Sequence, residues 1–260
     1  MDFHWSDSQL AWKERVIDFA RRELDDDIIS RDRESCFSRE YWDKCARFGI
    51  LGMCFPRQYG GQGEDVLTTI LVMEALGYGC KDNGLTGALN GQMWSIQEPI
   101  LTFGTEAQKK KYLTGLCNGT LLGDHGMTAA EAGSDAFSLT TRAEKRDGGY
   151  LLNGAKVMVG LAPVCDVALV FATTNPKRGW AGVTGFLVDR DTPGLSVGKP
   201  LDKLGLKTAP TAEITLEDVV VQPDMILGRV GGGSAIFNAE MEWERSCLFA
   251  AHVGVMQRQL

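Results

Sequence analysis

The chain has 260 residues, so the sequence predicts one large domain or two smaller ones. Hydrophobic residues make up 44% and charged residues 23%, as in an ordinary globular protein, which excludes general disorder. The net charge of -7 argues against a protein that binds nucleic acid or an anionic membrane over its whole surface.

Targeting signals and local reactive motifs are not evident. No apolar stretch reaches the length of a membrane span, and Met1 to Leu10 does not read as a signal peptide. Seven cysteines without a Cys-x-x-Cys pair predict reduced thiols and a cytoplasmic protein. The three histidines, His4, His125 and His252, are far apart, so no local metal site is predicted. Because the sequence contains no Gly-x-Ser-x-Gly elbow, nucleophilic catalysis has no support.

The first 118 residues predict helices whose starts carry capping residues. These starts are Ser6 with Gln9, Ser38, Asp65, and Thr105 with Gln108. The helix that follows Ser38 should stop at Gly49, because glycine adopts the left-handed conformation that ends helices.

The periodicity changes after about Asn118. Asp147-Gly148-Gly149 between two apolar runs is a hairpin signal. Further short, β-branched runs lie at 167–172, 183–188 and 214–221. Several short strands separated by turns predict an antiparallel sandwich or barrel. From Gly233 an amphipathic helical pattern returns and runs into the last residue, so the order is α, then β, then α interrupted.

Acidic residues crowd the last helix at Glu240, Glu242 and Glu244, around Trp243. One interpretation is a solvated, charged face. The other is that Glu244 points inward as a base, with its pKa raised by an apolar pocket. The spacing alone does not choose between them.

The segment 126–135 combines small residues, a threonine and a Ser-Asp pair at the start of the β region. Such a loop allows backbone donors to approach a flat or anionic ligand closely. The alternative is a plain connection between helix and sheet, and the two interpretations stay open. The glycines at 228–233 lack the strand and the acidic partner of a dinucleotide loop, which favours a flexible lead into a helix.

One segment carries a family pattern, approximately Met-Thr-Glu-Pro-x-Ala-Gly-Ser-Asp, which is matched at Met127, Thr128 and 132–135. Other similar segments are spread over the whole chain, at 48–50, 56–63, 74–77, 99–100, 103–109, 150–156, 192–194 and 203–207. On these residues the chain resembles the acyl-CoA dehydrogenase flavoprotein family. Segments 174–176, 194–198 and 243–248 are most similar to the branch that oxidises prolyl groups tethered to carrier proteins in pyrrole biosynthesis.

The resemblance implies an α+β fold in three parts. An N-terminal helical domain would span 1–118 and a middle antiparallel β-sandwich or barrel domain 119–226. Residues 227–260 would be the first helix of a C-terminal helical domain that is otherwise missing, so we expect a fragment of a longer enzyme or half of a split one. The implied cofactor is FAD, and the implied assembly is a homo-oligomer or a complex with a partner that supplies the missing helices.

The resemblance also implies roles for single residues. Glu244 matches the position of the catalytic carboxylate in one subset of the family. The residues that would contact the flavin include His125, at a position often held by an aromatic residue. The others are Met127, Thr128, Gly133, Ser134, Met158 and Gly160. Ser134, Glu242 and Arg245 would contact the substrate and its pantetheine arm.

The implied reaction is dehydrogenation of an acyl or aminoacyl thioester on CoA or a carrier protein. Glu244 would remove the α-proton, and a hydride would pass to flavin N5. Three departures from the family count against activity: Ala129-Ala130 replaces Glu-Pro, Met158 and Gly160 replace an aromatic and a hydroxyl residue, and the C-terminal helices are absent. The altered flavin-facing positions favour the alternative of a non-catalytic subunit that binds a carrier or partner, whereas Glu244, Arg245 and the loop 133–135 favour the enzyme. By composition, a basic patch for an acidic carrier would involve Lys177 and Arg178, or Arg142 with Lys145 and Arg146; the alternative for each is solvated surface charge.

Overall fold

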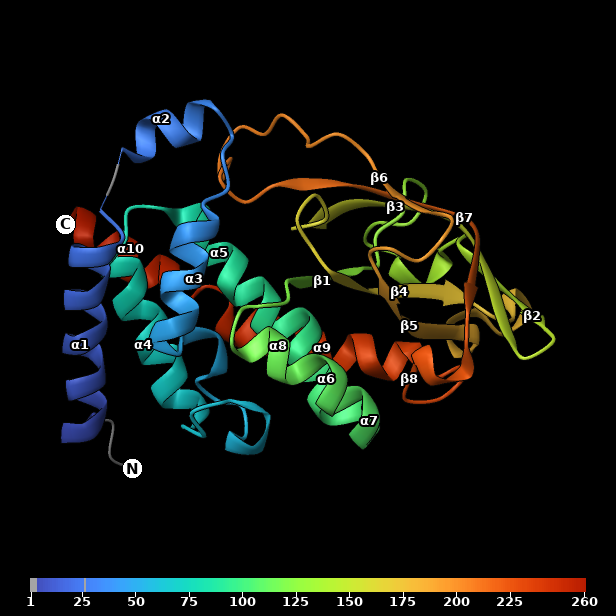
Figure 1. The fold of residues 1–260 in the computed structure, drawn as a ribbon, viewed down its shortest axis with the longest axis horizontal. Coiled ribbons are helices and arrows are strands. Elements are labelled where there is room, and N and C mark those ends of the chain that lie inside the picture. The colour runs from blue at the N-terminus through green and yellow to red at the C-terminus, as the bar shows by residue number, and fades with distance from the viewer. Residues whose placement is uncertain (1–3, 26) are drawn as a thin grey trace.

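The computed structural model describes residues 4–25 and 27–260, in which a helical part is followed by a sheet (Figure 1). The prediction that Met1 to Leu10 is not a signal peptide therefore concerns a segment of which residues 1–3 lie outside the described part of the chain. The α-helices are α1 Asp7–Glu23, α2 Ile28–Arg33, α3 Arg39–Phe48, α4 Val66–Gly79, α5 Asn83–Gln92, α6 Glu98–Phe103, α7 Glu106–Gln108, α8 Thr114–Cys117, α9 Gly233–Cys247 and α10 Ala250–Gln259.

The capping residues begin the helices that the sequence predicts. The side chains of Ser6, Ser38, Asp65 and Thr105 each accept a hydrogen bond from a backbone N–H of the first turn. This satisfies one of the donors that a helix start leaves free. The α3 helix ends at Gly49, whose φ of 97° is left-handed, as predicted. The short helix α2 was not predicted.

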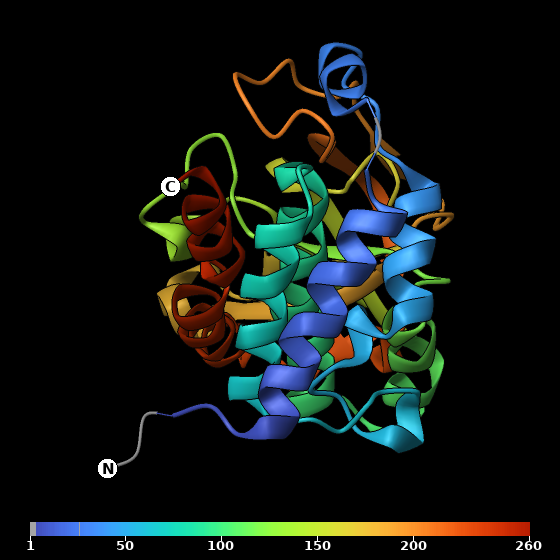
Figure 2. The ribbon, with the colours of Figure 1, turned by 90° about the vertical axis from the view of Figure 1, so that its left-hand side faces the viewer.

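The helix α4 lies between α1 and α10 (Figure 2). Close approach of α4 to α10 depends on small residues, because a Cβ at Gly77 would lie 1.9 Å from the carbonyl oxygen of Ala251. Helix α10, from the end of the chain, therefore packs against the N-terminal helices. Among the described helices, none has both the length and the apolar character needed to cross a bilayer.

In the described residues, eight strands form one sheet with the order β6-β7-β3-β2-β4-β5-β8, and β1 pairs with β4. Their bounds are β1 Gly123–Gly126, β2 Arg142–Arg146, β3 Gly149–Gly160, β4 Val167–Thr173, β5 Val183–Asp189, β6 Leu195–Val197, β7 Thr211–Val221 and β8 Ile226–Leu227. The predicted hairpin at Gly148 joins β2 to β3, with Arg146 opposite Gly149. Most pairs are antiparallel, as predicted, whereas β1 and β2 pair with β4 in parallel.

The helical and β parts of the chain are joined at Asp82, which begins α5. Its carboxylate accepts a hydrogen bond from Thr208 Oγ1 at 2.5 Å and forms an ion pair with Arg31 Nη1 at 2.6 Å. Asp82 is almost fully buried, so these contacts hold the loop before β7 against α2 and α5. The proposed domain boundaries at 118 and 226 stay predictions; α8 ends at Cys117, and β1 begins at Gly123.

Helix α9 starts at Gly233, as predicted, and runs from the sheet back toward the helical part (Figure 1). A Cβ at Gly233 would lie 2.9 Å from the backbone of Val183 and Thr184, so glycine allows the helix to begin against β5. The predicted unbroken pattern to the last residue is wrong in one respect, because the chain leaves the helix at Leu248 and Phe249 before α10 begins.

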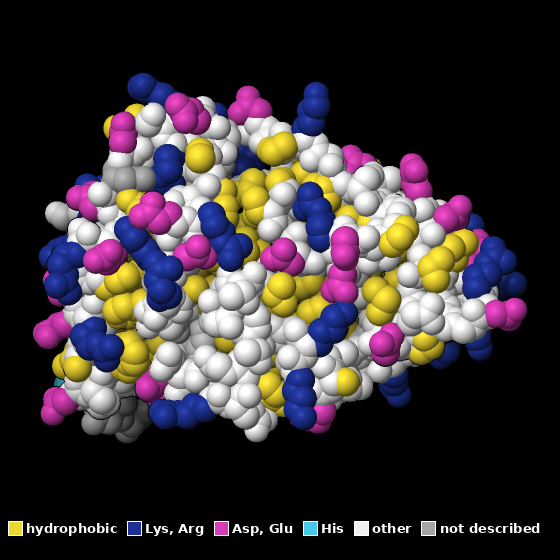
Figure 3. Space-filling view, viewed as in Figure 1, with side chains coloured by type: hydrophobic (Ala, Val, Ile, Leu, Met, Phe, Trp, Pro, Cys, Tyr) yellow, Lys and Arg dark blue, Asp and Glu magenta, His cyan; other side chains and the backbone are white. Residues whose placement is uncertain are grey.

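The charged side chains are mixed on the surface. On the face shown in Figure 3, acidic and basic side chains are interspersed between apolar ones. The net charge of -7 is therefore not concentrated on this face. Phe249, which precedes α10, and Val253 and Met256 of α10 are exposed.

Candidate active site

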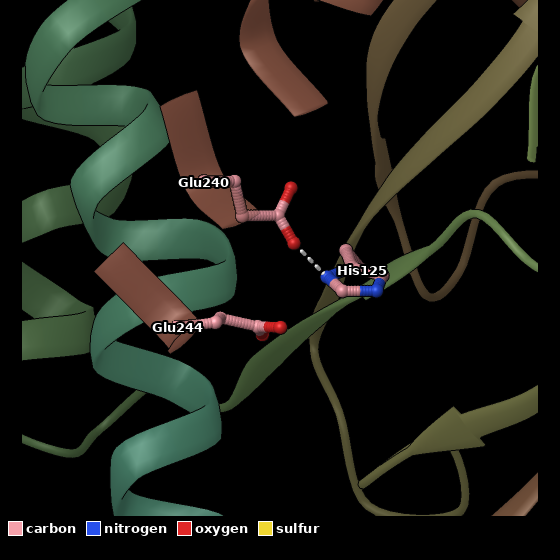
Figure 4. Close-up of side chains that lie close together, drawn as sticks. All are labelled: His125, Glu240 and Glu244. Carbon is pink, nitrogen blue, oxygen red and sulfur yellow. Dashed lines mark ion pairs between the residues drawn. The ribbon is translucent and has the colours of Figure 1, made fainter. Parts of the chain in front are cut away.

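Two glutamates of α9 face the first strand of the sheet. Glu240 and Glu244 are four residues apart, which places them one above the other on the same side of a helix. Both side chains lie next to His125 of β1 (Figure 4). Glu240 is fully buried and Glu244 half-buried, whereas Glu242 is exposed. The interpretation as a solvated face is therefore wrong for Glu240 and holds for Glu242.

His125 brings the sheet into the site. It lies opposite Leu169 in the parallel pair β1–β4. Its ring packs edge-on against that of Phe237, with the ring centroids 6.3 Å apart. Its Nδ1 forms an ion pair with Glu240 Oε1. Ligand-type atoms of His125, Glu240 and Glu244 all lie within 4.8 Å of one another. Residues more than a hundred positions apart in the chain thus form one cluster, which the wide spacing of the histidines did not reveal.

Burial and charge together shift the protonation of this cluster. Burial lowers the pKa of His125, but the Glu240 carboxylate, helped by Asp124 and Glu244, raises it by more, to about 10. Burial raises the pKa of Glu240 to about 7, although His125 acts in the opposite direction. Burial also raises the pKa of Glu244. A carboxylate with a raised pKa is a stronger base, which suits Glu244 to proton abstraction.

A third carboxylate, Asp124, precedes His125 in β1. Its Oδ1 accepts hydrogen bonds from Ser95 Oγ at 2.9 Å and from the His125 backbone N–H at 2.7 Å. Burial raises its pKa as well. Ser95 belongs to the π-helical turn Met93–Gln97 between α5 and α6, and such turns are frequent at functional sites.

The same π-helical turn places an indole against the residue that precedes the candidate base. Trp94 stacks on Trp243, the residue before Glu244, with ring centroids 5.7 Å apart and an interplanar angle of 9°. Trp94 is 1% exposed, and its Nε1 donates to Asn90 Oδ1 at 3.1 Å. The stack joins α9 to the π-helical turn and so helps to fix the helix that carries Glu244.

A buried lysine holds the loop that carries the family pattern. Lys156 Nζ donates to the carbonyl oxygen of Met127 at 2.9 Å, and the Val157 backbone N–H donates to the carbonyl oxygen of Thr128 at 2.9 Å. Lys156 has no exposed surface, and burial lowers its pKa to about 7. The loop is therefore fixed at its start, while Gly133 and Ser134 further along are exposed.

The residues predicted to contact a flavin have different surroundings. The side chain of Met127 is in the core, Thr128 is half-buried, and Met158 is 62% exposed with a left-handed φ of 58°. A Cβ at Gly160 would lie 2.3 Å from Asp124 Oδ2. The residues predicted to contact the substrate arm, Ser134, Glu242 and Arg245, are all exposed. Among the residues predicted for the site, the structure places Glu244 and His125 next to each other.

Three features of the site were missed by sequence reasoning: the half-buried Asp124, the buried Lys156 and the inward position of Glu240. For Glu240 a signal existed, because it precedes Glu244 by one helical turn and so shares its face. For Lys156 the strand alternation offered a hint, since it lies at an inward position of β3. Nothing local marked Asp124.

The helical part, the sheet and the acidic cluster between α9 and β1 agree with what the comparisons with known proteins show. Residues 6–120 match the model "Acyl-CoA dehydrogenase, N-terminal domain", and residues 125–219 match "Acyl-CoA dehydrogenase, middle domain". The chain belongs to the acyl-CoA dehydrogenase family, a family of oxidoreductases.

Within this family the chain is similar to carrier-protein enzymes. It is 38% identical to the L-prolyl-[peptidyl-carrier protein] dehydrogenase of Pseudomonas fluorescens, over 100% of this chain and 68% of that protein. The crystal structure of the prolyl acyl carrier protein oxidase AnaB superposes with a TM-score of 0.97 and 45% identity, covering 98% of this chain and 68% of AnaB. The structure of PigA with FAD and proline gives a TM-score of 0.95 and 37% identity, covering 99% of this chain and 67% of PigA.

Proposed function

We propose that this chain carries the base and the β-domain half of the flavin site of an FAD-dependent dehydrogenase. Its substrate would be an acyl or aminoacyl thioester, with a prolyl-like group on a carrier protein or CoA. The observation that carries the proposal is the half-buried Glu244, held beside His125 and Glu240 by the packing of α9 on β1. The similarity to prolyl-carrier enzymes supports the choice of substrate.

The residues around the 127–135 loop fit a flavin. An isoalloxazine ring needs an apolar surface against its face and polar groups along its edge. Met158 offers an exposed thioether side chain, which makes favourable contacts with aromatic rings. Thr128, linked to the same strand through Val157, offers a hydroxyl, and a Cβ at Gly133 would meet open space. We propose that Thr128, Gly133, Ser134, Met158 and Gly160 hold the flavin; Met127 contributes by its backbone position.

The chemistry needs a base at the α-carbon of the substrate. A thioester carbonyl acidifies the α-proton, and Glu244 as carboxylate accepts it. Burial raises the pKa of Glu244 and so makes it the stronger base. FAD, when bound, supplies the two-electron acceptor for the dehydrogenation. The stack of Trp94 on Trp243 joins α9 to the neighbouring π-helical turn and so helps to hold Glu244 in position.

The remaining contacts extend from the site to the surface. We propose that the exposed Ser134, Glu242 and Arg245 contact the pantetheine arm. Docking of an acidic carrier would use Lys177 and Arg178, which are exposed. The alternative patch is weaker, because Arg146 forms an ion pair with Glu144 at 3.0 Å.

Assembly and location belong to the same proposal. Further helices, from a second copy or a partner, would cover the exposed Phe249, which precedes α10, and the exposed Val253 and Met256 of α10. A cytoplasmic location is supported by the seven cysteines, which are all free thiols.

A second candidate function, a non-catalytic subunit that binds a carrier or partner, is favoured by one observation. Asp124 Oδ2 lies where a side chain at Gly160 would be, so this chain cannot present a hydroxyl from that position without moving Asp124. A missing hydrogen bond of this kind costs about 0.5–1.5 kcal/mol, which weakens flavin binding but does not abolish it.

The two functions are separated by flavin content and flavin reduction. The chain is purified alone and after co-expression with the C-terminal segment of AnaB that it does not cover. A flavin absorbance band that a prolyl thioester bleaches supports the dehydrogenase, and colourless protein under both conditions supports the subunit. Glu244→Gln should keep the flavin and lose the bleaching, whereas Glu213→Gln, on the exposed face of β7, should behave as the wild type.

A further inference from the structure

The surroundings of Glu244 are unusually acidic for a site that would receive only an apolar acyl group. Three carboxylates, those of Asp124, Glu240 and Glu244, have a pKa that burial raises, and the charge of Asp124 adds to this for Glu240 and for Glu244. One imidazole, His125, opposes them. The nearest further cation with a resolved influence on Glu244 is Arg245, which is exposed and therefore screened by water. The cluster thus has an excess of negative charge.

The Glu240 carboxylate of this cluster also lacks a hydrogen-bond donor. Neither oxygen of the buried Glu240 carboxylate has a hydrogen-bond partner among the described residues; Oε1 is in the ion pair with His125 Nδ1, whereas Oε2 is in no ion pair either. A buried carboxylate oxygen without a donor is costly, and native proteins rarely retain one without a functional reason. The Glu240 carboxylate can therefore accept one more hydrogen bond, preferably from a donor that carries a positive charge.

We propose that Glu240 and Glu244 form a binding site for a protonated amine on the α-carbon of the substrate, and that His125, the ion-pair partner of Glu240, holds Glu240 in place. This proposal rests on the proposed function and makes it more specific, because it assigns the preference for aminoacyl over simple acyl groups to Glu240. Glu240 is the specificity-determining residue, and Glu244 remains the base.

The spacing of the two glutamates matches such a substrate. In an aminoacyl thioester the nitrogen and the α-proton are bonded to the same α-carbon. When the α-proton points to Glu244, the nitrogen is therefore also close to Glu244. Glu240 is one helical turn away on the same face of α9, and its carboxylate lies within 4.8 Å of that of Glu244. His125 and Glu244 keep part of their surface accessible, so the amine approaches from their side.

The site explains why the acidic cluster is tolerated. An ammonium group between Glu240 and Glu244 neutralises the excess charge and donates to the free oxygen. A ring carbon in the same position does neither and leaves the buried carboxylates unpaired. Such a site discriminates strongly against an isosteric ligand that lacks the donor.

The test compares two pantetheine ligands of the same shape. One carries a prolyl group and the other a cyclopentanecarbonyl group, in which CH₂ replaces the ring NH₂⁺; both are amide-linked, so that neither reacts. Calorimetry measures their affinities for the wild-type chain, for Glu240→Gln, for Glu244→Gln and for the control Glu213→Gln. Because a hydrogen bond to a charged group contributes about 1.5–3 kcal/mol, the wild type should prefer the prolyl ligand about 10-fold to 100-fold.

The preference should fall to within about twofold in Glu240→Gln and persist unchanged in Glu213→Gln. Glu244→Gln, at a half-buried position, provides a second variant and should reduce the preference in part. Equal binding of both ligands to the wild type, or an undiminished preference in Glu240→Gln, overturns the proposal. Bleaching of the flavin by a prolyl thioester is measured separately: if it is absent while the preference is present, the dehydrogenase function is wrong and the amine site stands.

Discussion

The carboxylate of Asp124 occupies the space that a side chain on Gly160 would need. A Cβ at Gly160 would lie 2.3 Å from Asp124 Oδ2, closer than real Cβ contacts come. The other oxygen of Asp124 is held by Ser95 Oγ at 2.9 Å, so the carboxylate is not free to turn aside. Strand β3, strand β1 and the π-helical turn before α6 are therefore fitted together around a glycine.

We expect Gly160→Ala to lower the free energy of unfolding by about 1–3 kcal/mol, the usual cost of forcing an extra group into a packed site. Asp124→Gly in the same chain should recover much of this loss, because it removes the atom with which the new methyl group collides. Denaturant unfolding of the two single variants and the double variant measures the coupling.

Gly133→Ala is the matched control, since its Cβ meets open space, and its effect should stay within about 0.5 kcal/mol. Additive effects of Gly160→Ala and Asp124→Gly would show that the two residues do not compete for the same space.

The proposed base predicts how flavin reduction depends on pH. Burial raises the pKa of Glu244, so the carboxylate becomes protonated, and inactive as a base, at a pH above the ordinary carboxyl value of 4.5. The rate of bleaching by a prolyl thioester in stopped-flow measurements should fall on acidification with a midpoint above pH 4.5. Glu244→Gln should lower the rate at neutral pH by at least about 100-fold. A midpoint at or below 4.5, or a rapid Glu244→Gln variant, would place the base elsewhere.

The ion pair of His125 and Glu240 predicts how stability depends on pH. Folding raises the pKa of both groups, to about 10 for His125 and about 7 for Glu240. The folded state therefore binds more protons than the unfolded state, and stability must fall as the pH rises. The contribution of Glu240 is fully present below pH 4.5 and is lost as the pH rises through about 7; that of His125 is present below pH 6.5 and is lost through about 10.

The double variant His125→Gln/Glu240→Gln removes both titrations. Relative to this variant, the wild type should lose stability between pH 4.5 and 10, by at most about 1.4 kcal/mol per pH unit for each group. Thermal or denaturant unfolding at several pH values provides the comparison. A difference that stays constant over this range would mean that the pair does not change its protonation on folding.

The stack of Trp94 on Trp243 predicts a large effect at one indole and a small one at another. Trp94 is 1% exposed, so Trp94→Ala should lower the free energy of unfolding by about 3–5 kcal/mol and change the near-ultraviolet circular dichroism of the stacked rings. Trp180 is 64% exposed, and Trp180→Ala should change stability by no more than about 0.5 kcal/mol. Equal effects of the two substitutions would contradict the stacked arrangement.

Local signals in the sequence were reliable where a structure depends on neighbouring residues. The caps at Ser6, Ser38 and Asp65 and the hairpin at Gly148 were predicted correctly. Each involves contacts within a few residues, which the sequence displays directly. The short strands β1, β6 and β8 were not predicted. For β1 the reason is its sequence, Gly123-Asp124-His125-Gly126, which has no strand pattern of its own and is extended through its pairing with β4.

By itself the sequence determined the family, the order of helices and strands, and one candidate base. It also determined that Glu240 and Glu244 share a side of their helix, since helical spacing is a property of the backbone. Only the tertiary structure decided that this side faces inward, because burial depends on β1, which the chain brings to α9 from more than a hundred residues away. The same long-range packing raises the pKa of Glu244 and leaves Glu240 with an oxygen that lacks a donor, so the chemistry of the site arises from contacts that no local pattern contains.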